Sequence, residues 1–219
     1  MSINRDPHSG KRPERARDVG VHFDGDLRRA LIQAAATALD EVGADHLSLR
    51  DVARRIGVSH TAPAHHFTDK AGLLTAVAVE GFHLFIEHLG GALAATRDRR
   101  PLDRLPALAR AYAEFAERHP GRFEVMFRPA LIRPDDPDYQ RAGDAAFAAL
   151  REHIGLCQRQ GWRPDVPTAT LAAATWAFSH GIATLRGHGS LARHYGDASF
   201  GGVELLVTAM LGGAGQDPG

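Results

Sequence analysis

Residues 48–70, SLRDVARRIGVSHTAPAHHFTDK, contain the pattern that decides the fold of this chain. Ser48 is a typical helix N-cap with an acidic residue three positions later, and apolar residues follow it at helical spacing. Gly57 predicts the end of this short helix, and Gly57-Val58-Ser59 predicts a turn before a second short helical segment over His60 to Phe67. This layout is that of a helix-turn-helix.

The charge and polarity of this stretch suit contact with DNA. Four basic side chains stand against two acidic ones, and three histidines add hydrogen-bond donors. Pro63 and Phe67 lie four positions apart and are expected to face inward, so the remaining side chains of the second segment stay available to a ligand. These are His60, Thr61, Ala62, Ala64, His65 and His66. Because the whole chain has 26 basic and 26 acidic residues, any nucleic-acid contact must be local.

Helical patterns flank the stretch on both sides. Residues 1–25 lack periodicity and predict a flexible arm, whereas from Asp26 apolar residues recur on one helix face until Gly43 provides a stop signal. Thr68 and Asp69 offer an N-cap for a connecting helix that includes Leu73 to Leu93. Further helices are expected over Leu102 to His119, a broken stretch around Phe123 to Phe127, Pro137 to Gln160, Pro167 to Gly187 and Phe200 to Leu211.

These patterns predict an all-α protein with two parts. Strand-like alternation of Val, Ile and Thr is missing, and Gly and Pro punctuate the chain between helical segments. We therefore expect a helix-turn-helix head of three short helices over residues 26–72 and a larger helical domain over residues 73–219.

Composition narrows the class of protein further. The 219 residues include 44% hydrophobic and 24% charged residues, the profile of a globular protein. Cys157 is the only cysteine, so an intramolecular disulfide cannot form, and a reducing compartment is expected. The N-terminus lacks the apolar core of a signal peptide, and apolar runs such as Leu171 to Phe178 are too short to cross a bilayer. We expect a cytoplasmic protein without a membrane partner.

The helix-turn-helix stretch and its flanks resemble the DNA-binding domain of the TetR family of transcriptional regulators. The resemblance covers about residues 27–75 and rests on several motifs in combination. They are the Ser48-Leu49-Arg50-Asp51 helix start, the Gly57-Val58-Ser59 turn, the His66-Phe67 end of the second helix, and Lys70.

The resemblance implies roles for particular residues of the head. By position, Arg50 and Lys70 should bind DNA phosphates from either side, and His66 should also meet phosphate. The side chains expected to reach base edges are His60, Thr61, Ala62 and His65. Family members usually have an aromatic residue where this chain has Ala64, so that phosphate contact must be absent or replaced. The alternative is that the three histidines only cap and solvate a short surface helix.

Residues 101–213 resemble the ligand-binding and dimerisation region of the Trp-His-Gly subgroup of that family. Trp176, His180 and Gly181 form the signature, and the first two project from one side of a helix. The resemblance predicts a binding site for an unknown small-molecule effector. Its candidate residues are Tyr112, Phe115, Phe123, Met126, Phe127, Phe147, Trp176 and His180. The alternative is that Trp176 fills the core and His180 satisfies a buried carbonyl.

The last two long helices carry apolar residues at spacings that allow them to pair. These residues are Leu171, Ala174, Phe178, Val203, Leu206, Val207 and Met210. Because family members dimerise there, we expect a two-headed homodimer that reads a palindromic double-stranded DNA operator. The expected function is that of a transcriptional regulator, a repressor released by its effector. The alternative function is an all-helical enzyme or carrier of a hydrophobic small molecule whose head is an interaction module.

Several motifs associated with other chemistries do not meet the requirements of those chemistries. Glu80-x-x-His83 has the spacing of a di-iron ligand pair, but the further carboxylates and second pair are missing. Asp136 before Pro137 is typical of a helix start rather than of a metal-diphosphate motif. Phe178-Ser179-His180-Gly181 lacks the first glycine and the strand of a nucleophile elbow. We therefore expect no enzyme activity, no catalytic residues, no cofactor and no metal site.

Overall fold

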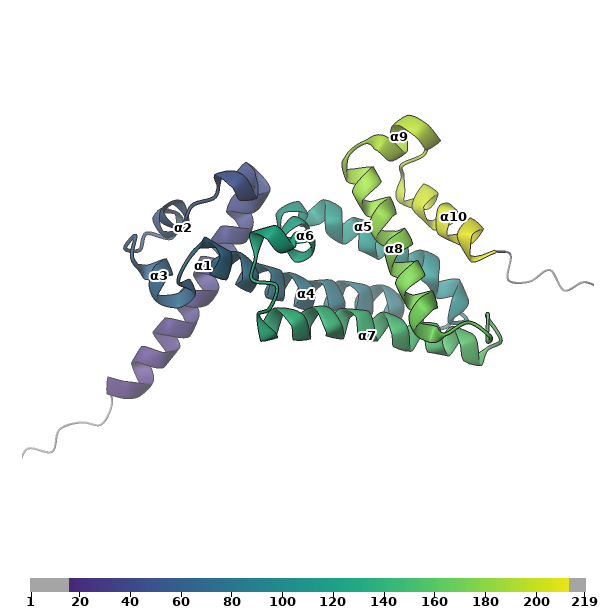
Figure 1. Cartoon of the computed structure of the whole chain (residues 1–219), viewed down its shortest axis with the longest axis horizontal. Helices are drawn as coiled ribbons and strands as arrows, with labels where there is room; N and C mark the ends of the chain where they lie inside the picture. Colours follow the sequence, from purple (N-terminus) through teal and green to yellow (C-terminus); the bar gives the residue numbers. More distant parts are fainter. Residues whose placement is uncertain (1–15, 213–219) are drawn as a thin grey trace, which may run out of the picture.

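The computed structural model describes residues 16–212, and this part of the chain is helical without strands (Figure 1). The helices of the head are α1 (Ala16–His46), α2 (Leu49–Arg55) and α3 (Ala62–Phe67). The body begins with α4 (Lys70–Ala95) and continues with η1 (Leu102–Arg104), α5 (Leu105–Arg118), α6 (Pro120–Phe127), η2 (Pro129–Leu131), α7 (Pro137–Arg159), α8 (Thr168–Gly187), α9 (Ser190–Tyr195) and α10 (Phe200–Leu211). The expected all-α architecture of head and body is confirmed.

The first helix begins earlier than its apolar pattern indicates. Helix α1 starts at Ala16 rather than at Asp26, the residue at which the apolar periodicity of the sequence begins. The remainder of the expected arm, residues 1–15, lies outside the described residues. The stop signal at Gly43 is confirmed: this residue has φ 72°, which interrupts the helix before a last turn that ends at His46.

Side-chain caps fix where α2, α4 and α7 begin. The Ser48 hydroxyl accepts a hydrogen bond from the backbone N–H of Asp51 at 3.2 Å and starts α2. The Asp69 carboxylate accepts one from Gly72 N at 2.8 Å and starts α4. Asp136 accepts from the N–H of Asp138 and starts α7, whose first residue is proline. These capping positions are predictable from sequence.

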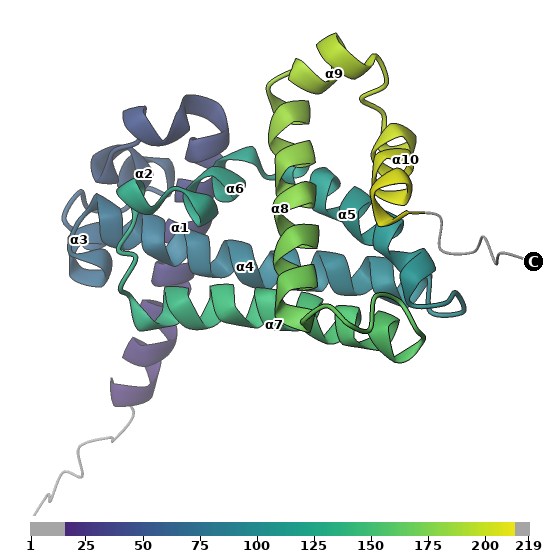
Figure 2. The same cartoon turned by 45° about the vertical axis from the view of Figure 1, so that its right-hand side comes forward.

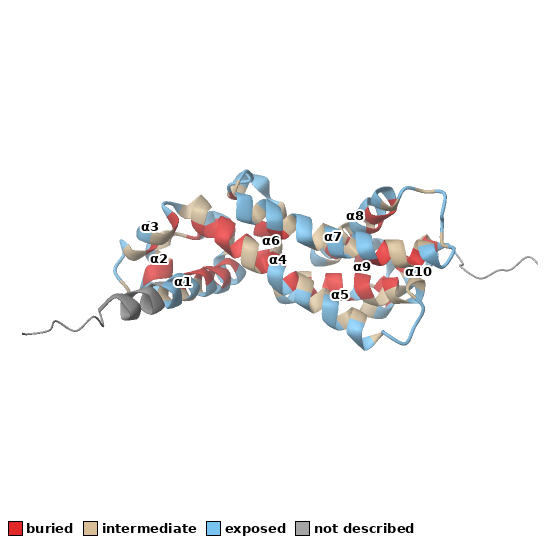
Figure 3. Ribbon diagram, turned by 90° about the horizontal axis from the view of Figure 1, so that it is seen from below, coloured by how far each residue is buried: buried red, intermediate tan, exposed pale blue. Residues whose placement is uncertain are grey.

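Helix α4 is the central helix of the molecule. It packs against α1 and α3 in the head and against α5, α6 and α7 in the body, as Figures 1 and 2 show. By length and composition it is the one described helix that could cross a membrane, but half of its apolar window is buried inside the protein. Figure 3 shows the buried residues running from the head along α4 into the body. The helix therefore serves as the core of a folded protein.

The C-terminal helices differ from the expected pairing in detail. Helices α8 and α10 both pack on α5, and a short helix that sequence reasoning missed, α9, connects them. Leu171, Val203 and Val207, three of the residues at pairing spacings, are buried within the single chain and pack in its core. Leu185 on α8 and Leu205 on α10 are instead exposed, at 49% and 59% of their surface. These helices therefore present apolar side chains to the outside of the chain.

Helix α7 carries a buried histidine and the single cysteine of the chain. Cys157 is buried, and burial raises the pKa of its thiol to about 11. His153, one turn earlier, is also buried, and its Nε2 lies 2.9 Å from the Pro101 carbonyl oxygen. Burial lowers the pKa of His153, which favours a neutral ring that donates this hydrogen bond.

Candidate nucleic-acid interface and ligand cavity

Helix α3 presents its polar side chains on the outer face of the head. Pro63 and Phe67 are buried, as their spacing predicts, and anchor the helix on the head core. Among the candidate base-reading residues, His60, Thr61 and His65 are exposed, and Ala62 is half-buried. Ala64 is exposed and His66 is half-buried. The helix therefore displays a contiguous surface of small and polar side chains that is rigidly held from behind.

The turn before α3 holds the start of this helix in place. The Ser59 and Thr61 hydroxyl oxygens lie 2.9 Å apart, and the Thr61 backbone N–H donates to Ser59 Oγ at 3.3 Å. Helix α3 begins at Ala62, two residues later than the sequence pattern indicates, because residues 60 and 61 belong to this turn. His60 and Thr61 thus lie at the N-terminal end of α3, the end that helix-turn-helix proteins direct toward base edges.

Basic side chains around α3 differ in how far they are already neutralised. Arg54 pairs with Asp51 at 2.8 Å, and Arg55 pairs with Glu41 at 2.6 Å. The hydrogen bond from Arg55 lowers the pKa of Glu41, which keeps this carboxylate charged. Arg50 is exposed and pairs with no acidic group of the described chain, whereas Lys70 Nζ donates to the Asp45 carbonyl oxygen at 3.3 Å. Arg50 and Lys70 therefore keep their positive charge available.

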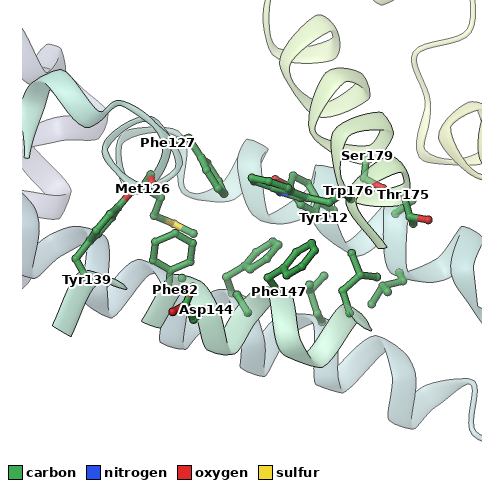
Figure 4. A pocket seen from close by; sticks show the side chains of 18 of the residues that line it. Phe82, Tyr112, Met126, Phe127, Tyr139, Asp144, Phe147, Thr175, Trp176 and Ser179 are labelled. Atoms are coloured by element: carbon green, nitrogen blue, oxygen red, sulfur yellow. Dashed lines mark hydrogen bonds between the residues drawn. The ribbon is translucent and has the colours of Figure 1, made fainter. Parts of the chain in front are cut away.

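A large cavity lies in the body between α4, α5, α6, α7 and α8, with a volume of about 710 Å³ (Figure 4). This volume falls in the range of small-molecule sites. Aromatic side chains from all five helices make up much of its wall. Those lining the cavity are Phe82, Phe85, Tyr112, Phe127, Tyr139, Phe147 and Trp176. The body thus contains an apolar site with room for an organic molecule.

The structure separates the candidate ligand residues into two groups. Tyr112, Met126, Phe127, Phe147 and Trp176 line the cavity. Phe115, Phe123 and His180 do not line it. Phe115 is 1% exposed and packs edge to face on Phe85, so it belongs to the core. Phe123 stacks on the His180 ring at 5.3 Å, and both lie behind the residues that face the cavity.

A chain of hydrogen bonds joins the cavity wall to His180. Trp176 Nε1 donates to the Tyr112 hydroxyl at 3.2 Å, and that hydroxyl lies 2.9 Å from His180 Nδ1. Burial lowers the pKa of His180 and raises that of Tyr112, which favours the neutral form of both groups. Because indole is only a donor, the Tyr112 hydroxyl accepts from Trp176 and can donate to His180. The neutral histidine then carries its proton on Nε2.

Sequence reasoning missed the part of the wall that comes from α4 and the start of α7. Phe82 and Phe85 fit the apolar pattern of the connecting helix, and Tyr139 belongs to no motif of the sequence, yet all three line the cavity. A signal is present, since Tyr139, Gly143 and Phe147 recur every four residues on α7 and share the cavity wall. Such spacing predicts that the three residues share a helix face. It does not tell whether that face packs against another helix or lines a cavity.

Head and body are connected by specific contacts beyond α4. The Arg133 guanidinium, from the segment between α6 and α7, pairs with Asp69, which precedes α4, at 3.0 Å. The Arg133 backbone N–H donates to Thr75 Oγ1 of α4 at 2.9 Å, which holds this segment in place within the body. On the other side, Gly121 N donates to Asp40 Oδ1 at 2.7 Å. The buried Arg122 donates to Gln33 Oε1 at 2.8 Å. Helix α6 is therefore fastened directly to α1.

The residues considered for metal binding form no such centre in the structure. Glu80 and His83 line a polar cleft of about 380 Å³ beside the end of α3, together with Arg28 and Arg133. Among residues 16–212, no group of three or more His, Cys, Asp or Glu side chains could hold a metal ion. Asp136 acts as the N-cap of α7, the role that its position before proline predicts.

Two family models match this chain. Residues 31–77 match the model described as bacterial regulatory proteins, tetR family, and residues 105–210 match the model described as tetracyclin repressor-like, C-terminal domain. The first match contains the helix-turn-helix, and the second contains α5 to α9 and most of α10.

Curated relatives of the chain are named as regulators. An uncharacterised HTH-type transcriptional regulator of Mycobacterium tuberculosis is 28% identical over 208 residues, which cover 93% of this chain and 90% of the relative. The HTH-type transcriptional regulator BetI of Serratia proteamaculans is 40% identical over 85 residues, which cover 37% of this chain. The chain aligns with only 41% of the length of that BetI protein.

Solved structures share the same architecture. A protein of unknown function from Rhodococcus sp. RHA1 is 31% identical, with a TM-score of 0.74, over 84% of this chain and 93% of that one. The TetR family transcriptional regulator PfmR of Thermus thermophilus has a TM-score of 0.58 at 20% identity, over 83% of this chain and 94% of that one. The second similarity shows the shared fold alone.

Proposed function

The chain belongs to the TetR family of bacterial transcriptional regulators, and from this premise we propose that it is a repressor that a small-molecule effector releases from a palindromic operator. The observation that carries the proposal is the combination of an exposed polar α3 on the head with an aromatic cavity in the body. A helix-turn-helix supplies DNA recognition, and the cavity supplies an effector site. This combination favours a regulator over the alternative of an enzyme or carrier with an interaction module.

Different residues of the head are suited to contact DNA phosphates and DNA bases. Arg50 and Lys70 flank the helix-turn-helix with available charges, which suits the backbone of DNA. We assign His60, Thr61, Ala62 and His65 to contacts with base edges and His66 to a phosphate contact. Ala64 is exposed but has no polar group, so it contributes no hydrogen bond to a phosphate.

Dimerisation is proposed through the outer faces of α8 and α10. Leu185 and Leu205 are exposed large apolar residues, and Phe178, Leu206 and Met210 are only partly buried. Large apolar side chains left exposed on neighbouring elements can mark interaction sites on globular proteins. Two copies related by a two-fold axis would place both heads on one face of a DNA duplex, in successive major grooves. That geometry requires a palindromic operator.

Effector binding can reach the head through the segment between α6 and α7. Met126 and Tyr139, at its two ends, line the cavity and are joined by a hydrogen bond from the Tyr139 hydroxyl to the Met126 carbonyl oxygen at 2.9 Å. Between them, Arg133 pairs with Asp69, the N-cap of α4, which lies two residues after the end of α3. A ligand that displaces this segment would therefore change the orientation of the head and favour one head spacing over another.

The finer assignment to the Trp-His-Gly subgroup is part of the proposal. It is supported by the hydrogen bonds that join Trp176, Tyr112 and His180, because these give the signature residues a shared structural role at the cavity wall. Gly181 follows His180 within α8, and because glycine has no side chain it leaves the helix surface open at that position.

The experiment that tests the function is selection of genomic DNA fragments by the purified full-length protein. Anisotropy titrations of the best fragment at several salt concentrations would follow, with light scattering of the complex to count protein copies. We expect a palindromic site that binds two copies, with an affinity that falls steeply as salt rises. Failure to enrich any fragment, or affinity that is independent of salt, would contradict the proposal.

A further inference from the structure

The cavity of the body has one charged wall residue, and its charge is negative. Asp144 of α7 is the only charged side chain among the described residues that line the cavity. On the premise of the proposed function, we infer that the effector is a hydrophobic cation. Such a molecule has an apolar body and one amine or quaternary ammonium group, and its charge lies beside Asp144.

The Asp144 carboxylate is available for such a ligand. It pairs with no basic side chain of the described chain, whereas Asp138 on the same helix is bonded to Arg141. Gln140, Asp144 and Phe147 follow one another at spacings of four and three residues, so they share a helix face. Figure 4 shows Asp144 beside Phe82 of α4, with Phe147 further along α7. A cation at this position would meet both a carboxylate and aromatic rings.

The aromatic wall suits a positive charge as well as an apolar body. The rings of Phe82 and Phe127 lie 5.6 Å apart, and Trp176 lies 6.2 Å from Phe127 and 6.1 Å from Phe147. The faces of aromatic rings carry partial negative charge and attract ammonium groups, with tryptophan the strongest. Trp176 remains 41% exposed, so its ring has surface left for a ligand.

An anionic ligand would find few partners in the same cavity. The Tyr112 hydroxyl is bonded to Trp176 and His180, and the Tyr139 hydroxyl donates to the Met126 carbonyl oxygen. The Thr175 hydroxyl donates within its own helix to the Leu171 carbonyl oxygen at 2.8 Å. The Gln140 amide already donates one hydrogen bond to the Pro134 carbonyl oxygen at 3.3 Å. The Ser179 hydroxyl and the second N–H of Gln140 are the donors that remain, and Asp144 would repel a carboxylate. The lining therefore selects against acids.

Three ligands with the same ten-carbon chain can test the inference: decyltrimethylammonium, decanol and decanoate. The chain has two tryptophans, and Trp162 does not line the cavity, so Trp162→Phe leaves Trp176 as the only indole reporter. Titrations of this full-length variant, below the concentrations at which the ligands form micelles, would follow the fluorescence of Trp176. We expect the cation to bind about threefold to tenfold more tightly than the alcohol, and the carboxylate to bind most weakly.

Two neutralising variants separate the Asp144 carboxylate from general charge effects. Asp144→Asn should bring the affinity of the cation close to that of the alcohol, whereas Glu152→Gln, an exposed neutralisation on the same helix outside the cavity, should keep the preference for the cation. Tighter binding of decanoate, or an unchanged preference in Asp144→Asn, would overturn the inference. Binding of none of the three would also overturn it, but specific DNA binding by the same preparation would still support the regulator.

Discussion

The candidate sites of the head and of the body consist of different kinds of residues. The candidate DNA-binding surface comes from one contiguous stretch, residues 48–70, and its side chains are mostly exposed and polar. The cavity draws on five helices from α4 to α8, and its side chains are aromatic and packed against one another. The difference teaches that a site made of exposed local residues can change without loss of fold. A site made of packed distant residues cannot be changed without altering its neighbours.

The largest difference in stability is expected between substitutions on the buried face of α3 and substitutions on its exposed face. Phe67→Ala removes a ring that is 4% exposed, and Phe→Ala substitutions in cores cost about 3–5 kcal/mol. We expect the free energy of unfolding in urea to fall by about this amount, with loss of DNA binding. His65→Ala on the exposed face should leave the unfolding midpoint unchanged. An equal loss of stability in the two variants would remove the distinction between anchor and reading surface.

The junction between head and body should be the next most sensitive place. A Cβ atom on Gly121 would lie 2.5 Å from Leu39 Cβ and 2.9 Å from the Asp40 backbone nitrogen, so α6 could not approach α1 as closely. We expect Gly121→Ala to destabilise the protein by about 1–3 kcal/mol, the cost of overpacking. Thermal unfolding would measure this, with Gly155→Ala on α7, where space is available, as the control. If Gly121→Ala melted at the same temperature as Gly155→Ala, α6 would be free to shift away from α1 and the prediction would be wrong.

Within the head, phosphate and base contacts should respond differently to substitution. Lys70→Ala should weaken binding to all sequences and reduce the slope of log affinity against log salt by about one. His65→Ala should instead change the preferred sequence, with a loss of about tenfold on the original site. Arg97→Ala, an exposed charge far from the head, is the control. Uniform losses across sequences in both variants would contradict separate roles.

The smallest expected effect concerns pH and the body. Burial lowers the pKa of His180, so below about pH 6.5 the unfolded chain binds a proton that the folded protein does not accept. Its contribution to stability is therefore full above pH 6.5 and declines as the pH falls. Between about pH 7.5 and 5.5, the free energy of unfolding should fall less in His180→Gln than in the natural chain. One proton can change this free energy by at most about 1.4 kcal/mol per pH unit, and the difference should be well below that limit because His180 is only partly buried.

Urea unfolding at the two pH values would check this difference. Burial also lowers the pKa of His119 and His153, so the variant should keep part of the acid sensitivity. A variant with the same pH dependence as the natural chain would show that His180 does not titrate differently in the folded state.

Most of the fold and the position of the head surface could be predicted from sequence, for identifiable local reasons. The Ser48 and Asp136 caps and the positive φ of Gly43 are encoded by single residues and their neighbours. The start of α3 was missed by two residues because the Ser59 and Thr61 hydroxyls hold a turn there. Helix α9 was missed because it is short and has a single buried residue, Leu191.

The cavity could be predicted only in part, because enclosure depends on how helices meet. The family resemblance predicted Tyr112, Phe127 and Trp176 at the site, and all three line the cavity, but Phe115 was predicted with them and lies in the core instead. Nothing in the local sequence distinguishes a ring that faces space from one that faces another helix. The same applies to Val203 and Val207, whose apolar pattern fits an outer face equally well but which the packing of α10 on α5 buries.

The buried thiol of Cys157 makes this protein convenient for spectroscopic labelling. With a pKa of about 11 and almost no exposed surface, the thiol resists maleimide and methanethiosulfonate reagents at neutral pH. A cysteine introduced at the exposed Thr37 of α1 would therefore take up a spin label without removal of the native residue. In a dimer, dipolar coupling between the two labels would measure the separation of the heads directly, with and without a bound cation.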